Sequence, residues 1–193
     1  MNRIEFFFHH IKPGKILDIG NLGRAHLIHS RLLRDYPESD IYGLDTDDQA
    51  PYGHHFPNQY RGNAEDMPFS NEYFDTIILG EVLEHTWTPK RMIDECFRVL
   101  KPTGVFLLST PNIYALSRMV RYFFVGKDVI LGGPEHKIFF SRAMLDNILK
   151  KAGFREVLTL SDSKCTVKRN DFALPSWGTF RFMGEHLVAK AIK

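Results

Sequence analysis

The chain has 193 residues, of which 44% are hydrophobic and 25% charged, a composition that predicts one globular domain and disfavours intrinsic disorder. Its formal net charge of +2 is too small to indicate a nucleic-acid or membrane-surface partner by charge alone. With two cysteines, no secretory signal and no apolar run near about 18 residues, we expect a cytoplasmic protein without a disulfide scaffold or inserted membrane segment.

The first half of the chain alternates strand-like and helix-like segments, which is typical of an α/β fold with a mainly parallel sheet. Residues 46–60 are rich in Asp, His, Pro and Gly, so we expect at most a short helix there. The predicted elements are an amphipathic segment over 2–12, a strand over 15–19, a helix over about 24–35, and strands over 41–44 and 74–79.

The second half continues the alternation. Thr88 and Pro89 have the form of an N-cap and first helical residue, and Lys101–Gly104 predicts the turn that ends this helix before a strand over 105–109. Its apolar face is expected to comprise Met92, Ile93, Cys96, Phe97 and Leu100. Another helix should begin at the N-cap Ser141 and end before Gly153, with Met144, Leu145, Ile148 and Leu149 inside, followed by strands over 154–160 and 187–192.

Residues 111–140 fit this alternation poorly. A long excursion between a strand and a helix is often a lid or a wall of a substrate site, and it can equally be a packing helix with a loop. The sequence leaves both open. We expect a single domain over 1–193 with this segment as its insertion.

Small and polar residues follow the predicted strands where each one ends. In an open parallel sheet, ligands bind beyond these carboxyl ends. Glycines after the first strand let backbone approach a ligand, Asp45 can accept hydrogen bonds from both hydroxyls of a ribose, and Asn63 with the Ala64 backbone can read an adenine edge. Gly80 and Glu81 would form the floor of this cofactor site. The predicted cofactor-binding residues are Asp18, Gly20, Asn21, Gly23, Asp45, Asn63, Ala64 and Glu81.

A dinucleotide-binding site is the first competing interpretation. It requires G-x-G-x-x-G at the start of a helix, to seat a pyrophosphate on the helix N-terminus. Here Leu22 occupies the place of the second glycine. A nucleoside ligand without phosphate demands less of this loop, so the departure weighs more against a dinucleotide.

Four short segments follow one another along the chain: NAEDMPF at 63–69, VLEH at 82–85, RVLKP at 98–102 and STPN at 109–112. In this order they resemble the class I S-adenosylmethionine-dependent methyltransferases, over about residues 13–160. The resemblance implies a Rossmann-like doubly wound sheet of seven strands, mostly parallel with an antiparallel last strand, and an enzyme that uses S-adenosylmethionine. The chain departs from the family pattern at Leu22, where a glycine is usual, and at Asn63, where aspartate is.

Methyl transfer also needs groups that orient the acceptor and take its proton, and we expect these near Glu81 and beyond. Glu84 and His85 follow at steps of three and one, so a helical turn starting at Glu81 would place all three on one face. Together with His136, they resemble metal-dependent ubiquinone-pathway O-methyltransferases and small-RNA 3′-end 2′-O-methyltransferases, which implies Mg²⁺ or Mn²⁺ as one alternative. We favour the other, in which His85, Glu84 and His136 are catalytic residues of the acceptor site without a metal.

The leading functional hypothesis is methyl transfer to O or N of a small molecule or of a glycan, lipid or polyketide-type intermediate. One alternative is a metal-dependent RNA 3′-end ribose 2′-O-methyltransferase, although a nucleic-acid partner is the less favoured one. Another is a non-catalytic cofactor-binding regulatory or scaffold protein, which Leu22 alone supports. The RNA alternative would need a basic track, for which the candidates are Arg118, Arg121, Lys127, Lys137 and Arg142.

Overall fold

The computed structural model describes residues 1–23, 26–47, 56–125, 135–162 and 184–193. In chain order the elements are α1 (Arg3–His10), β1 (Lys15–Ile19), α2 (His26–Asp35), β2 (Asp40–Asp45), β3 (Gln59–Arg61), β4 (Phe74–Gly80), the 3₁₀ turn η2 (Leu83–His85), α3 (Pro89–Val99), β5 (Leu100–Pro111), α4 (Leu116–Val125), α5 (Arg142–Lys151), β6 (Arg155–Ser161) and β7 (His186–Ile192).

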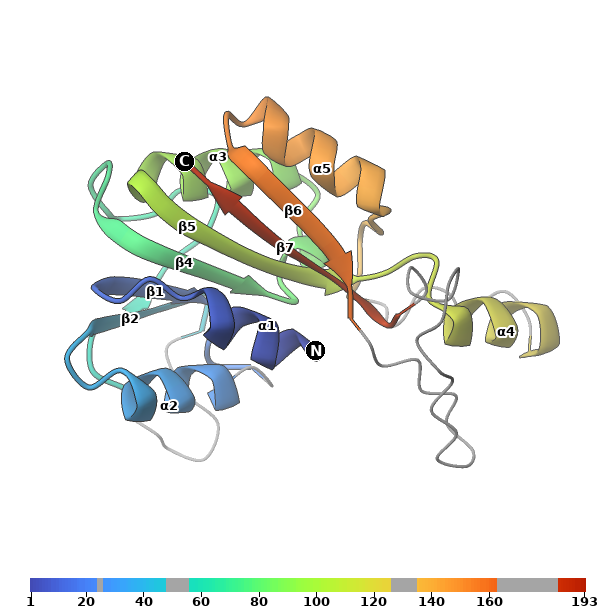
Figure 1. Ribbon diagram of the computed structural model, residues 1–193, viewed down its shortest axis with the longest axis horizontal. Coiled ribbons are helices and arrows are strands. Elements are labelled where there is room, and N and C mark those ends of the chain that lie inside the picture. The colour runs from blue at the N-terminus through green and yellow to red at the C-terminus, as the bar shows by residue number, and fades with distance from the viewer. Residues whose placement is uncertain (24–25, 48–55, 126–134, 163–183) are drawn as a thin grey trace.

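The strands form one sheet of seven in the order β3-β2-β1-β4-β5-β7-β6. The pairs among β3, β2, β1, β4 and β5 are parallel, and β7 runs antiparallel to both of its neighbours. Helices α1 and α2 cover one face of the sheet, and α3 and α5 cover the other (Figure 1). This confirms the predicted Rossmann-like doubly wound sheet with an inserted antiparallel last strand.

Local sequence signals fix the helix ends. Asn2 caps α1 by accepting the Glu5 N–H at 2.9 Å, while the Glu5 carboxylate accepts the Asn2 N–H at 2.8 Å, which is a capping box. Ser141 caps α5 by accepting the Met144 N–H at 3.3 Å. Gly153 ends that helix at φ +104°, a conformation that glycine adopts without steric cost. Of the predicted helix over 24–35, residues 24–25 lie outside the described residues.

The core has two layers, one on each face of the sheet. The larger layer packs α3 and α5 through Ile93, Cys96 and Leu145, and the smaller one packs α1 and α2 through Phe7 and Leu32. Because side chains alternate between the faces of a strand, each buried strand contributes to both layers. The sheet is therefore held rigidly, and its carboxyl ends are fixed relative to one another.

Three details of the sequence prediction are wrong. The sequence prediction places no strand in the stretch 46–60 and so misses β3, a short edge strand that only its pairing with β2 reveals. Residues 48–55 of this stretch lie outside the described residues, so the prediction of at most a short helix stays untested there. Leu100 and the predicted turn Lys101–Gly104 belong to β5, with Thr103 at φ 62° where the ladder is irregular. Met144 is 51% exposed, because Leu145 and Leu149 take the core positions of α5.

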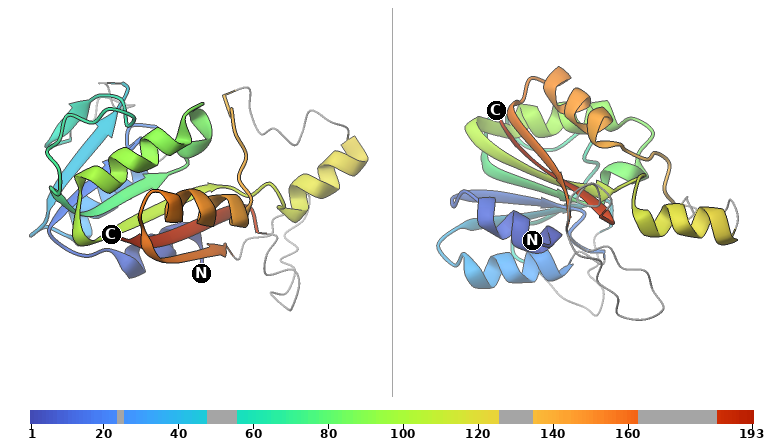
Figure 2. Two further views of the ribbon diagram at one scale, coloured as in Figure 1. Left: turned by 90° about the horizontal axis from the view of Figure 1, so that it is seen from above. Right: turned by 45° about the vertical axis from the view of Figure 1, so that its right-hand side comes forward.

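The insertion over 111–140 contains α4, which projects beyond the carboxyl ends of the strands and away from the sheet (Figure 2). The segment returns at Phe140, which pairs with Asn112 in an isolated bridge. Residues 126–134 lie outside the described residues, so the lid or substrate-wall role stays a prediction.

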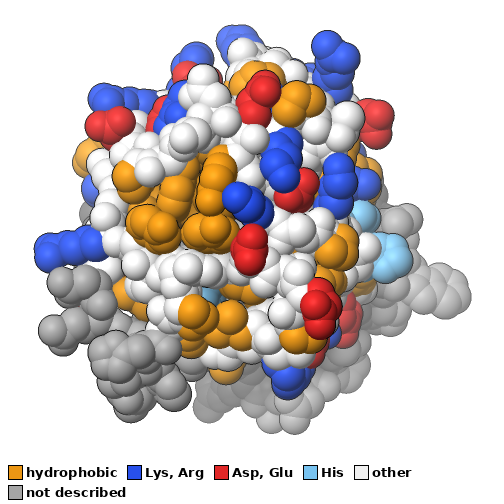
Figure 3. Space-filling view, turned by 90° about the vertical axis from the view of Figure 1, so that its left-hand side faces the viewer, with side chains coloured by type: hydrophobic (Ala, Val, Ile, Leu, Met, Phe, Trp, Pro, Cys, Tyr) orange, Lys and Arg blue, Asp and Glu red, His pale blue; other side chains and the backbone are white. Residues whose placement is uncertain are grey.

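The opposite end of the sheet carries an aromatic cluster. Hydrophobic side chains gather on the face at the amino ends of the parallel strands (Figure 3). Tyr42 contacts the rings of Tyr60, Phe69 and Tyr73, and the Lys15 ammonium lies 3.8 Å from the Tyr73 ring centre. Among the helices described, none has the length and apolar character needed to cross a membrane.

Candidate functional site

A cavity of about 420 Å³ opens at the carboxyl ends of β1, β2 and β4. It brings together the loops that follow these strands, as the strand-end argument predicts. Of the predicted site residues, Gly20, Asp45, Asn63, Ala64 and His85 line it. The full lining is Ile19, Gly20, Leu44, Asp45, Thr46, Gly62, Asn63, Ala64, Glu65, Val82, His85, Thr86, Met92 and Lys137.

The first loop turns tightly at Gly20, whose φ is +74°. A Cβ atom at this position would lie 2.4 Å from Val82 Cγ2, so only glycine fits without moving the neighbouring strand end. Leu22 does not block the cavity, because its side chain is buried in the core. Its backbone N–H donates to Asp45 Oδ2 at 3.0 Å, which ties the first loop to the end of β2.

Asp45 lies half-buried in the cavity wall. Its Oδ2 accepts the Leu22 N–H, and its Oδ1 accepts the Asp47 N–H at 3.2 Å and the Thr46 hydroxyl at 3.4 Å. These bonds fix the orientation of the carboxylate. Oδ2 retains a further acceptor site, and Oδ1 gains one when the Thr46 hydroxyl rotates away, so the group can accept both hydroxyls of a ribose.

The loop after β3 supplies the next wall. Asn63 Oδ1 accepts the Glu65 N–H at 2.9 Å, and the Asn63 carbonyl accepts the Asp66 N–H at 3.0 Å, so the turn is closed by its own residues. Ala64 is nearly buried beside it. Sequence reasoning missed Glu65, which lines the cavity and accepts a hydrogen bond from the Thr86 hydroxyl. That bond is the main reason why the pKa of Glu65 is lowered.

Three predicted residues do not line the cavity. The Asp18 carboxylate is buried against His29, with Oδ2 3.2 Å from Nδ1, and burial raises its pKa. Asn21 is fully buried and forms a reciprocal amide pair with Gln59 at 2.7 and 3.1 Å. Gly23 is exposed. The first two support the loop from behind, and the structure does not bring any of the three to the cavity.

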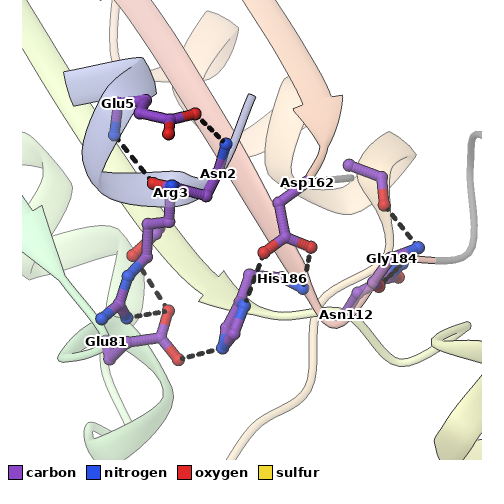
Figure 4. Close-up of polar contacts among 10 residues, drawn as sticks. Asn2, Arg3, Glu5, Glu81, Asn112, Asp162, Gly184 and His186 are labelled. Atoms are coloured by element: carbon purple, nitrogen blue, oxygen red, sulfur yellow. Dashed lines mark hydrogen bonds and ion pairs between the residues drawn. The ribbon is translucent and has the colours of Figure 1, made fainter. Parts of the chain in front are cut away.

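Glu81 has φ 59°, which lies outside the right-handed helical region, and η2 begins only at Leu83. The predicted helical turn from Glu81 is therefore wrong, and the Glu81 carboxylate does not belong to the cluster that Glu84, His85 and His136 form. Instead it turns toward α1 (Figure 4). Its Oε1 lies 3.2 Å from Arg3 Nη1 and accepts the Ser109 hydroxyl at 2.9 Å.

His186 joins this network from the start of β7, with Nε2 3.6 Å from Glu81 Oε2 and Nδ1 3.0 Å from Asp162 Oδ2 (Figure 4). Sequence reasoning missed both His186 and Asp162, because no local pattern relates them to residue 81. Burial alone would lower the pKa of His186, but the Asp162 and Glu81 carboxylates outweigh it, so the pKa is raised.

We expect His186→Asn to destabilise the fold more at pH 6 than at pH 9. A raised pKa in the folded state stabilises the protein fully below the unfolded-state pKa of about 6.5 and is lost as pH rises through the folded value. Urea unfolding at both pH values measures the difference. The exposed His9, replaced in the same way, should show none. Equal losses for His186→Asn at pH 6 and pH 9 would contradict a charged His186.

Glu84, His85 and His136 do meet, as the sequence predicts. One ligand atom from each lies within 4.8 Å of the others. Glu84 is buried and accepts the Thr110 hydroxyl at 3.1 Å; burial, together with the charge of Glu81, raises its pKa to about 8. The ring centres of His85 and His136 are 4.9 Å apart. His136 Nδ1 is buried without a hydrogen-bond partner among the described residues, and burial lowers the pKa of this imidazole.

Comparison with known proteins gives matches to methyltransferases. Residues 17–108 match the family model described as a methyltransferase domain. A Mycolicibacterium smegmatis protein named as a probable S-adenosylmethionine-dependent methyltransferase is 35% identical over 125 residues, which are 62% of this chain and 45% of that protein. A ubiquinone biosynthesis O-methyltransferase from Psychrobacter arcticus is 35% identical over 86 residues, 42% of this chain and 33% of that protein.

The chain thus spans less than half the length of these curated relatives. A crystal structure of a SAM-dependent methyltransferase from Archaeoglobus fulgidus has the same fold, with a TM-score of 0.73 at 17% identity over 99% of this chain and 91% of that one. Residues 17–108, just under half of the chain, thus match a methyltransferase domain, and the chain has the fold of a SAM-dependent methyltransferase.

Proposed function

We propose that this chain binds S-adenosylmethionine in the 420 Å³ cavity and transfers its methyl group to an oxygen or nitrogen atom of a small molecule or of a glycan, lipid or polyketide-type intermediate. The observation that carries the proposal is the convergence of Gly20, Asp45 and Asn63 on one cavity. The cationic sulfonium, when bound, supplies an activated methyl group.

The chain's own residues then have three tasks. Asp45 and the Asn63–Ala64 turn hold the nucleoside, and Gly20 allows close approach of backbone. His85 lies on the cavity wall and belongs at the same time to the Glu84–His85–His136 cluster. It is therefore placed to orient the acceptor or to take its proton as the new bond to the methyl carbon forms and the carbon–sulfur bond breaks.

We expect His85→Ala to lower turnover roughly 100-fold or more, as loss of a general base does, while the affinity for S-adenosylhomocysteine stays within about threefold. Release of S-adenosylhomocysteine over a panel of phenols, catechols and amines gives turnover, and calorimetry gives affinity. His9→Ala is the control. Equal losses of turnover and affinity would show that His85 serves the cofactor cavity alone.

A divalent ion in the Glu84–His85–His136 cluster is the second candidate. The unpartnered Nδ1 of His136 favours it, because one carboxylate and two imidazoles would suit Mn²⁺ or Mg²⁺. The relative from Psychrobacter arcticus is named as a ubiquinone biosynthesis O-methyltransferase, which also supports an oxygen acceptor. The cluster would hold the ion beside the acceptor. The ion would then lower the pKa of an acceptor hydroxyl that coordinates it.

If a metal binds there, Mn²⁺ titration followed by electron paramagnetic resonance should show one site per chain, and both Glu84→Gln and His136→Ala should weaken it at least about tenfold. Glu135→Gln, next to the cluster, is the control. Full turnover in excess chelator, together with no bound Mn²⁺ signal, would remove the metal and leave the metal-free mechanism.

The structure adds little support for the two remaining hypotheses, an RNA ribose methyltransferase and a non-catalytic cofactor-binding protein. For RNA, Lys137 lines the cavity, whereas Lys127 and the side chain of Arg121 lie outside the described residues. For a non-catalytic protein, the only support was Leu22, and this residue is buried away from the cavity and helps to fix Asp45. We therefore keep a small-molecule acceptor as the proposal.

A further inference from the structure

A second cavity, of about 690 Å³, lies at the same edge of the sheet. Because β7 is antiparallel, its first residues lie beside the last residues of β5 and β6, and the first turns of α5 close the space over them. The residues that line it are Asn112, Tyr114, Ser141, Arg142, Ala143, Asp146, Ser161 and Leu187. We call this the α5 cavity.

The α5 cavity and the cofactor cavity share no lining residue among those described. The segment 135–141 runs between them, because Lys137 lines the cofactor cavity and Ser141 lines the α5 cavity. This segment is fixed by the Lys137 N–H, which donates to the Glu84 carbonyl at 2.8 Å, and by the Phe140 carbonyl, which accepts the Ile113 N–H at 3.2 Å. It also carries His136.

The polar groups of the α5 cavity differ in what they offer. Ser141 Oγ accepts the Met144 N–H at 3.3 Å and Ser161 Oγ accepts the Gly184 N–H at 2.7 Å, so these bonds engage each hydroxyl as an acceptor and leave its O–H to donate. Asp146 Oδ1 is buried and has no hydrogen-bond partner among the described residues. An acceptor left in this condition is costly, and a donor brought by a ligand removes the cost.

The rest of the lining suits a molecule with an apolar body. Leu187 and Ala143 present aliphatic surface, and Tyr114, which is 58% exposed, presents an aromatic ring and a hydroxyl. A volume of this size is typical of sites for small organic ligands. Arg142 also lines the cavity and has contacts of its own.

We propose that the α5 cavity is a second ligand site, and that its ligand is a largely apolar small molecule whose amino group binds the Asp146 carboxylate. The inference does not depend on the proposed function, because the two cavities share no lining residue among those described. Asp146 would be a specificity-determining residue, and the site would favour an amine over an equally shaped neutral molecule.

Two probes of matched shape test this: 2-phenylethylamine, which is cationic at neutral pH, and 2-phenylethanol, which is neutral. Each is titrated by calorimetry into the full chain with and without saturating S-adenosylhomocysteine. We expect the amine to bind at least tenfold more tightly than the alcohol. Asp146→Asn should abolish that preference, and Ala143→Trp should weaken both probes at least tenfold by filling the cavity.

Two control variants test whether these effects are specific to the α5 cavity. Met144→Trp introduces the same side chain on α5 but outside the lining, and Asp94→Asn removes an acid on α3 that pairs with Lys90. Both should leave the amine affinity unchanged. The proposal is overturned if neither probe binds, or if Asp146→Asn and Ala143→Trp bind both probes as the wild type does. Binding of S-adenosylhomocysteine, measured separately, reports on the proposed function, so either idea can fail alone.

Discussion

Replacing Asp45 by alanine is expected to weaken binding of S-adenosylmethionine and S-adenosylhomocysteine about 100-fold. The proposed nucleoside site gives this carboxylate two ribose hydroxyls, and hydrogen bonds to a charged acceptor contribute about 1.5–3 kcal/mol each. Losing about 3 kcal/mol in total corresponds to roughly a 100-fold change in Kd. The substitution also leaves the Leu22 N–H without its acceptor, so the first loop loses its tie to β2.

Calorimetry with both ligands measures the effect. Asp45→Asn should lie between the wild type and the alanine variant, because an amide keeps one acceptor oxygen but carries no charge. Asp40→Ala removes an exposed acid at the other end of β2 and should leave affinity unchanged. An Asp45→Ala affinity within threefold of the wild type would place the nucleoside elsewhere.

The second large effect concerns the pH dependence of stability. Glu84 is 1% exposed and its pKa is raised to about 8, so the folded protein favours its protonated form. Such a group stabilises the fold fully below its unfolded pKa of about 4.3, and that contribution is lost as pH rises through the folded value. The wild type should therefore lose on the order of 4 kcal/mol from this group between about pH 5 and pH 9.

Glu84→Gln cannot ionise, so it should lack this loss and be more stable than the wild type at pH 9. Urea unfolding in excess chelator, repeated across the pH range, gives the difference between the two proteins. Glu72→Gln changes an exposed carboxylate and should reproduce the wild-type curve. If the Glu84→Gln and wild-type curves run parallel, Glu84 is ionised in the folded protein and the assignment is wrong.

Much of the fold followed from the sequence because buried strands, caps and turns are local signals. The strand over 15–19 and the Ser141 cap need only a few neighbouring residues to specify them. The strand β3 could not be predicted, since three partly exposed residues bury little apolar surface and depend on pairing with β2. Leu100 was placed in a helix because its apolar character fits either element.

The site was predictable to the extent that strand ends determine it. Gly20, Asp45 and Asn63 reach one cavity because their strands are neighbours in a parallel sheet. The positions of the other predicted site residues depend on backbone conformation and on partners that are distant in the sequence. The positive φ of Glu81 turns its carboxylate to the α1 side, and the buried Asn21 pairs with Gln59. His186, Asp162 and Asp146 gain their surroundings from distant strands and helices, which no spacing in the sequence reveals.

The most direct test of the central claim is a crystal structure of the chain with S-adenosylhomocysteine. The account predicts the adenosine in the 420 Å³ cavity, with the ribose hydroxyls about 2.8 Å from the Asp45 carboxylate oxygens and the adenine against Ala64. Density for the ligand at any other place, or a cavity that stays empty at millimolar ligand, would contradict it.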